Sequence, residues 1–147
     1  MKLSARACYG TRALIELART WKQGPTLLKD IARSQQVSLP YLARLMSPLI
    51  AAGLVRSTRG VRGGVWLAQP PHEVKLSDVI RLLDGPLSLR ECVADPDGCP
   101  QSSVCVARDL WAELDSTING LLASVTLQDL VQQQAMKQRA QEGMYYI

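Results

Sequence analysis

The sequence predicts a mainly α-helical fold with a small β-hairpin wing: a winged helix-turn-helix domain followed by a long amphipathic helix. Three observations predict it. Two short helical patterns with a tight break between them occupy residues 26–50, and two short β-like stretches flank a glycine-rich turn at residues 59–64. A longer helical pattern begins near residue 110. With 147 residues, 47% of them hydrophobic, the chain has the size and composition of one globular domain with an extension.

A first helix is expected from Ser4 to about Trp21. Its apolar residues recur on one helical face, opposite Arg6, Arg12 and Arg19. The dipeptide Gly24-Pro25 ends this helix and starts a turn.

Two short helices follow the turn. The first covers roughly residues 26–35, and Gln36-Val37 makes a tight break. The next starts at Ser38, a good N-terminal cap, with Pro40 in its first turn, where the missing N–H costs nothing. Pro48 lies inside this second pattern, so we expect it to kink the helix or end it.

A glycine-rich β-hairpin is expected next. Residues 54–58 and 65–68 read as paired strands, and Arg59-Gly60-Val61-Arg62-Gly63-Gly64 forms the turn between them. A helix-turn-helix followed by a basic hairpin is the pattern of a winged helix.

The charge of the chain divides sharply along its length. Residues 1–66 contain eleven Lys or Arg and two acids, a net charge of +9, whereas the remainder carries −5. A basic half joined to an acidic half favours a polyanion-binding module followed by something else. The alternative is a chance sorting of solvated charges.

Together the helices and the hairpin predict contacts with double-stranded DNA. Small side chains at Ser38 and Pro40 allow close approach to a major groove, and Tyr41 and Arg44 can reach phosphates or base edges. At the wing, Gly60 lets the backbone enter a minor groove, whose negative potential favours Arg59 or Arg62. Alternatively, the glycines only shape a hairpin and the arginines are solvated.

Three cysteines lie in one Pro/Gly-rich loop of the second half. A short helix over residues 76–83 ends at Gly85-Pro86, and the loop from about residue 87 to 104 leads through Cys92 and Cys99 to Cys105. Thiolates bind iron–sulfur clusters, zinc or copper(I), so the donor set alone does not decide which metal centre is bound. The closely spaced cysteine pairs of structural zinc sites are missing, and the cytosol argues against stable disulfides. Free, unliganded cysteines are the remaining alternative.

Two helices are expected after the loop. The first is long and amphipathic, and its apolar stripe is too large for a single helix to leave in water. The second begins near Thr126, with Thr126 or Ser124 as its cap, and becomes rich in glutamine. The stripe of the first comprises Leu110, Trp111, Leu114, Ile118, Leu121 and Val125.

Several classes of protein are disfavoured. No apolar run approaches the ~20 residues of a membrane span, and the first residues lack the apolar segment of a secretory signal, so we expect a soluble, cytoplasmic protein with no membrane contact. His72, the lone histidine, reads as an exposed loop residue. A small metalloenzyme or redox carrier would have only Asp95, Asp97 and Asp109 as bases near the cysteines and would leave the +9 half unexplained, so we expect no enzyme.

As a set, several motifs closely resemble the IscR/NsrR family of bacterial repressors. The resemblance covers essentially the whole chain and is densest over residues 1–70. The motifs are Met1-Lys-Leu-Ser4 with Tyr9-Gly10, Val37-Ser-Leu-Pro-Tyr-Leu42, Ala52-Gly-Leu-Val55, Arg59-Gly60-x-x-Gly63-Gly64, Asp109-Leu-Trp111 and Thr126-Leu127-x-x-Leu130-Val131.

The resemblance implies a homodimeric, winged-helix regulator with an iron–sulfur cluster. Residues 1–70 would be the DNA-binding domain, and residues 71–147 would hold the cysteine loop and the dimerisation helices. Helix 3 around Tyr41 would contact the major groove and Arg59 with Gly60 the minor groove. IscR-like members often carry Glu where this chain has Ala43, so the operator sequence is not inherited.

For the cluster, the resemblance implies Cys92, Cys99 and Cys105 as ligands of a 2Fe–2S or 4Fe–4S centre. IscR-like proteins supply a histidine where this chain has Arg108, which stays protonated and does not ligate. Cys8, at the position where NsrR-like members use an aspartate, is the preferred fourth ligand and would reach the cluster across the dimer. The alternative for Cys8 is a small buried hydrophobic residue.

The expected function is therefore a dimeric repressor of a pseudo-palindromic operator, controlled by iron–sulfur, iron or redox status. The alternative is a cluster-free member of the same family, controlled by thiol oxidation or by a protein partner.

Overall fold

The protein is described by a computed structural model that covers residues 2–145. Within that range the fold is mainly helical with one antiparallel hairpin, as predicted. The elements are α1 (Ala5–Arg19), α2 (Leu28–Gln35), α3 (Leu39–Ala51), β1 (Val55–Thr58), β2 (Gly64–Leu67), η1 (Pro71–Glu73), α4 (Leu76–Asp84), α5 (Glu91–Ala94), η2 (Pro96–Gly98), α6 (Val106–Ser124) and α7 (Leu127–Tyr145).

Helix α1 contacts α2, α3, α4, α7 and β2. Ser4 caps it, because its Oγ accepts a hydrogen bond from the backbone N–H of Ala7 at 3.1 Å. The backbone N–H of Ser4 also donates to the Asp84 carboxylate at 3.0 Å, which joins the start of α1 to the end of α4. The predicted apolar face is buried against α3 and α4.

The tight break between α2 and α3 is confirmed. Gln36 adopts the left-handed conformation, with φ of +56°, and ends α2. Ser38 then caps α3 as predicted, accepting from the backbone N–H of Tyr41 at 3.2 Å. This turn fixes the angle at which α3 leaves α2.

Of the two outcomes expected at Pro48, an end of the helix is wrong, since α3 runs through Pro48 to Ala51, and a kink stays a prediction. Proline removes the hydrogen bond to the carbonyl four residues earlier and crowds that carbonyl, which here belongs to the exposed residue Arg44. The helix continues beyond it, because the N–H of Ala52 donates to the Pro48 carbonyl at 3.0 Å.

The hairpin contributes buried side chains to the core. β1 and β2 pair antiparallel with Val55 opposite Leu67, and both side chains are buried. On the other edge of β2, Thr26 and Val65 exchange two backbone hydrogen bonds of 2.9 and 2.8 Å and form an isolated antiparallel bridge.

One apolar core joins the N-terminal helices to later elements. Val79 and Leu83 of α4 and Leu127 at the start of α7 lie in the same buried cluster as α1, α3 and the hairpin. The division of the chain at residue 70 stays a prediction.

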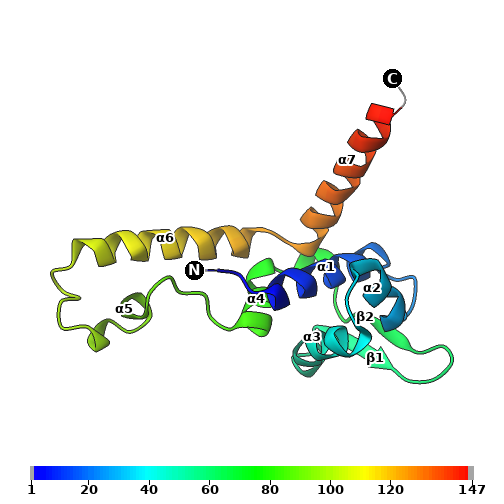
Figure 1. Ribbon diagram of the computed structural model, residues 1–147, viewed down its shortest axis with the longest axis horizontal. Helices are drawn as coiled ribbons and strands as arrows, with labels where there is room; N and C mark the ends of the chain where they lie inside the picture. The colour runs from blue at the N-terminus through cyan, green and yellow to red at the C-terminus, as the bar shows by residue number, and fades with distance from the viewer. Residues whose placement is uncertain (1, 146–147) are drawn as a thin grey trace.

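Helix α6 extends away from this body (Figure 1), and none of its residues is buried. Helix α7 begins at a capping arrangement in which Thr126 Oγ1 accepts from the Asp129 N–H at 3.2 Å, confirming Thr126 as the cap. The N–H and hydroxyl of Thr126 donate to Asp129 in return, and these bonds hold the pKa of that carboxyl below its usual value. Within residues 2–145, every helix is too short or too polar to span a membrane.

Candidate nucleic-acid interface and cysteine loop

The candidate DNA contacts of the helix-turn-helix lie at the start of α3. Ser38, Pro40 and Arg44 are exposed, and Tyr41 is half-buried. Helix α3 packs against β1, so the hairpin lies directly beside it. The exposed start of α3 and the exposed turn of the hairpin thus belong to elements that pack together.

The turn of the wing carries two unpaired cations. Arg59, Gly60 and Arg62 are exposed, and neither arginine forms an ion pair within residues 2–145. Gly60 has a φ of +106°, a conformation that glycine adopts without strain.

Gly63 is required by close approach of the backbone. Its N–H donates to the carbonyl of Gly60 at 2.9 Å, and a Cβ at this position would lie 2.6 Å from the Thr58 carbonyl oxygen. The glycines therefore do shape the hairpin, and by doing so they hold Arg59 and Arg62 at its exposed end.

Two residues near α3 were not among the predicted contacts. The Tyr9 ring packs edge-on against the Tyr41 ring, with centroids 6.1 Å apart and an interplanar angle of 86°. The guanidinium carbon of Arg12 lies 5.4 Å from the Tyr9 centroid, in cation–π geometry. The only sequence signal is the spacing of Tyr9 and Arg12 by one helical turn.

Glu16, on α1, connects this helix to the helix-turn-helix. Glu16 accepts hydrogen bonds from the side chains of Ser34 and Gln35 at the end of α2. One of the two acids in the basic half is thereby committed to holding α2 against α1, which the sequence alone did not indicate.

The cysteine loop is more ordered than expected. It contains the short helix α5 and the 3₁₀ turn η2, where an irregular loop was predicted. Cys92 lies in α5, Cys99 directly follows η2, and Cys105 directly precedes α6. All three are half-buried and free of disulfides.

Two of the three loop thiols share a cavity. A hollow of about 640 Å³ is lined by both Cys92 and Cys99, together with Asp95 and Glu91, but not by Cys105. No group of three or more Cys, His, Asp or Glu side chains within the described range is positioned to hold a metal ion. The structure thus brings together part of the predicted ligand set.

The donor chemistry nevertheless fits an iron–sulfur cluster. Cys92, Cys99 and Cys105 are all unpaired thiols on one loop, and thiolates are the usual ligands of such clusters. Cys105 stands immediately before the first turn of α6, at the end of the same loop that carries the other two thiols.

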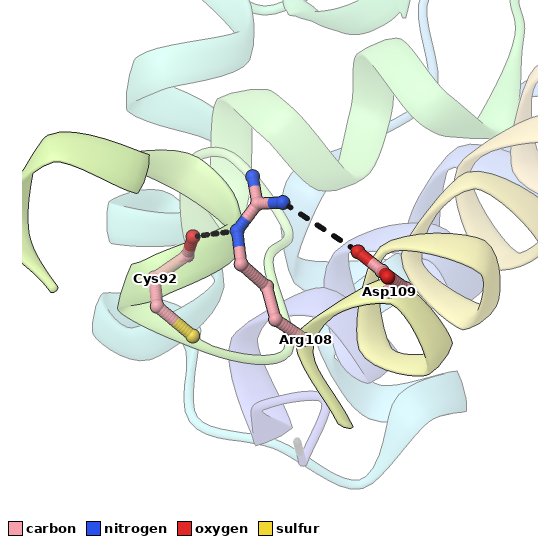
Figure 2. Close-up of polar contacts among 3 residues, drawn as sticks. All are labelled: Cys92, Arg108 and Asp109. Carbon is pink, nitrogen blue, oxygen red and sulfur yellow. Dashed lines mark hydrogen bonds and ion pairs between the residues drawn. The ribbon is translucent and has the colours of Figure 1, made fainter. Parts of the chain in front are cut away.

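Arg108 joins the two ends of the cysteine loop (Figure 2). Its Nε donates to the backbone carbonyl of Cys92 at 2.9 Å, and its Nη1 lies 3.9 Å from Oδ1 of Asp109. The side chain is 21% exposed. Arg108 therefore ties α5 to the first turn of α6.

Two further contacts hold the start of the loop on the same helix. The N–H of Leu89 donates to the Asp115 carboxylate at 2.9 Å, and the Asn119 amide reaches the carbonyl of Leu87 at 3.4 Å. The loop is thus fastened to α6 at several points.

Cys8 is exposed on α1, so the alternative that it is a buried hydrophobic residue is wrong for the single chain. It does not line the cavity that holds Cys92 and Cys99. His72 is exposed in η1, as predicted, with its Nε2 3.8 Å from the Glu73 carboxylate.

Helix α6 presents an apolar surface to solvent. A groove of about 340 Å³ is lined by Leu89, Arg90, Trp111 and Leu114. The exposed apolar side chains of this helix are Val106, Leu110, Trp111, Leu114 and Leu121.

The comparison with protein families gives one match over most of the chain. Residues 3–133 match the Rrf2 family, described as iron-dependent transcriptional regulators. The HTH-type transcriptional regulator CymR of Bacillus subtilis is 39% identical over the full length of both chains. The HTH-type transcriptional regulator IscR of Photorhabdus laumondii is 34% identical and is covered over 81% of its length, against 91% of this chain.

Solved structures show the same likeness. IscR of T. potens is 36% identical, with a TM-score of 0.78 over 99% of this chain and 97% of that structure. The structure of CymR, described as the global cysteine regulator of B. subtilis, superposes with a TM-score of 0.77 over 90% of this chain and 97% of that one.

Proposed function

The chain belongs to the Rrf2 family of transcriptional regulators, and on that basis we propose that it is a homodimeric DNA-binding repressor controlled by an iron–sulfur cluster. The observation that carries the proposal is the joining of two features in one chain. The chain carries a basic surface formed by α3 and the wing, and it also carries a loop with three free thiols. Neither feature alone would distinguish a sensor from a simple DNA-binding protein.

DNA binding is assigned to α3 and the wing. The first turn of α3 would enter the major groove with Ser38, Pro40, Tyr41 and Arg44, where phosphates and base edges are both in reach. Arg59, Gly60 and Arg62 would reach the adjacent minor groove. The exposure of both elements and the packing of α3 beside β1 support this assignment.

The dimer interface is assigned to α6. Its row of exposed apolar side chains is a surface that a second copy would cover, since soluble proteins rarely leave such a stripe in water. A two-fold symmetric dimer reads a pseudo-palindrome with half-sites about one or two helical turns apart. A regulator of this kind works on the bacterial chromosome, so we place it in the cytoplasm.

The cluster, 2Fe–2S or 4Fe–4S, is assigned to Cys92, Cys99 and Cys105. When bound, such a group supplies a centre that iron limitation, oxidants or nitric oxide can alter. The exposed thiol of the partner subunit's Cys8 is proposed as the fourth ligand. Arg108 is not a ligand, because its guanidinium stays protonated.

Arg108 gives the loop a mechanical link to the dimer helix. Because Arg108 donates a hydrogen bond to the Cys92 carbonyl, a change in the conformation of α5 would displace the first turn of α6. A shift of α6 would change the relative placement of two DNA-binding domains in a dimer, and so the affinity for a two-fold operator.

A second candidate is a cluster-free regulator controlled by thiol oxidation or by a protein partner. Two observations favour it: Cys92 and Cys99 line one cavity without Cys105, and one similar protein is a cysteine regulator. Iron and sulfide analysis separates the two candidates.

The wing assignment predicts the effect of Arg59→Ala. The variant should bind duplex DNA more weakly, and the slope of log affinity against log salt should fall by about one, because one phosphate-equivalent charge is lost. Fluorescence anisotropy over a series of salt concentrations measures both quantities. Arg81→Ala on α4, where Arg81 already lies 3.8 Å from the Asp78 carboxylate, is the control and should leave the slope unchanged. An unaltered slope in Arg59→Ala would remove the wing from the contact surface.

A further inference from the structure

We propose that Arg12, held on the ring of Tyr9, is a DNA backbone contact that the first helix adds beside α3. The inference rests on the proposed DNA binding by α3 and the wing. It extends that binding surface to a helix that none of the predicted contacts involves.

The first step is the position of the guanidinium. Tyr41 belongs to the first turn of α3, and the Tyr9 ring packs against it with centroids 6.1 Å apart. Arg12 in turn lies over the Tyr9 ring, 5.4 Å from its centroid. A single aromatic ring therefore separates the cation from the turn of α3 that is proposed to meet DNA.

The second step is the orientation of this arginine. A flexible side chain loses conformational freedom when it binds, and a stacked guanidinium has lost part of that freedom beforehand. Tyr9 is half-buried and is itself fixed edge-on by Tyr41, so the ring is a firm platform for the cation. The N–H groups of the planar guanidinium remain able to donate to phosphate oxygens.

The third step is that the charge of Arg12 is not neutralised by a carboxylate within the described residues. Arg12 is exposed and forms no ion pair within residues 2–145. The carboxylate one turn further along α1, that of Glu16, instead accepts from Ser34 and Gln35. An unpaired cation, fixed in place at the edge of a basic surface, has the chemistry of a phosphate contact.

The test uses the full-length protein and a fluorescent duplex of mixed sequence, because backbone contacts act on any sequence. Arg12→Ala is expected to weaken binding about three- to tenfold and to lower the salt slope by about one. Arg139→Ala removes the same charge from exposed α7 and should change neither quantity appreciably.

A second pair of variants tests the platform. Tyr9→Phe keeps the ring and should bind as the parent protein does, whereas Tyr9→Leu removes the stacking surface and should weaken binding less than Arg12→Ala does. In the double variant Tyr9→Leu/Arg12→Ala the combined loss should be smaller than the sum of the two single losses, because Tyr9 acts in part through Arg12 and otherwise through its contact with Tyr41. Thermal melting of each variant shows that it is folded.

Each outcome has a distinct meaning. A parent protein that binds no duplex overturns the proposed function itself. A parent that binds, with Arg12→Ala matching it in affinity and salt slope, overturns the contact while leaving DNA binding in place. Fully additive losses in the double variant overturn the role of Tyr9 as the platform.

Discussion

Replacing Cys92 with alanine is expected to abolish the iron–sulfur absorption of the anaerobically purified protein. The variant loses one of three thiolate ligands, and a cluster with an open coordination site exchanges or degrades its iron. Cys99→Ala and Cys105→Ala should give the same colourless protein. Absorption spectra, with iron measured per chain, check all three variants.

The matched control is Ser103→Ala in the same loop. Ser103 is exposed and lies two residues before Cys105, so its removal disturbs the loop without touching a thiol. It should retain colour and iron. A Cys92→Ala protein as brown and as rich in iron as the parent would contradict the ligand assignment.

The assignment of Cys8 is tested by the lifetime of the chromophore. With three loop thiols intact, Cys8→Ala should still acquire colour but lose it faster in air than the parent protein does. An unchanged spectrum and lifetime would remove Cys8 from the site.

The second large effect is expected for Gly63→Ala at the turn of the wing. The new Cβ would lie 2.6 Å from the Thr58 carbonyl oxygen and 2.8 Å from that of Gly60, and both are backbone atoms that cannot swing aside. The turn must open, which displaces Arg59 and Arg62. Loss of a minor-groove contact worth about 1.4 kcal/mol corresponds to a loss of about tenfold in affinity. Anisotropy with a duplex probe measures this change.

The matched control for this substitution is Gly143→Ala. Gly143 lies on α7, and a Cβ added there would have no neighbouring atom within 4 Å, so alanine fits and raises helix propensity. DNA affinity should be unchanged. Thermal melting should show that both variants are folded, and parent-like affinity in a folded Gly63→Ala protein would contradict the role of the turn.

The helix-turn-helix was predictable because its signals are local. The Ser38 cap, the break at Gln36 and the glycine-rich turn of the hairpin each act within a few residues of chain. Pro48 shows the limit of such reasoning. The rule that proline breaks a helix is outweighed here by the packing of Leu45 and Leu49, which are buried on either side of it.

The remaining features depend on contacts between distant residues. Nothing near Tyr9 in the sequence indicates that Tyr41, on another helix, will pack against its ring. The same holds for Arg108, whose hydrogen bond to the Cys92 carbonyl spans sixteen residues. The cysteine loop was correctly located, but its short helix and the placement of Cys105 outside the cavity of Cys92 and Cys99 were not indicated by the local sequence pattern.

The central claim is that the three loop cysteines hold an iron–sulfur cluster, and its most direct test is anaerobic purification followed by an absorption spectrum with iron and acid-labile sulfide per chain. We expect a brown protein with about two or four irons per chain and a matching amount of sulfide. A colourless protein that iron and sulfide cannot reconstitute would contradict the claim and leave a DNA-binding regulator whose cysteines serve thiol chemistry instead.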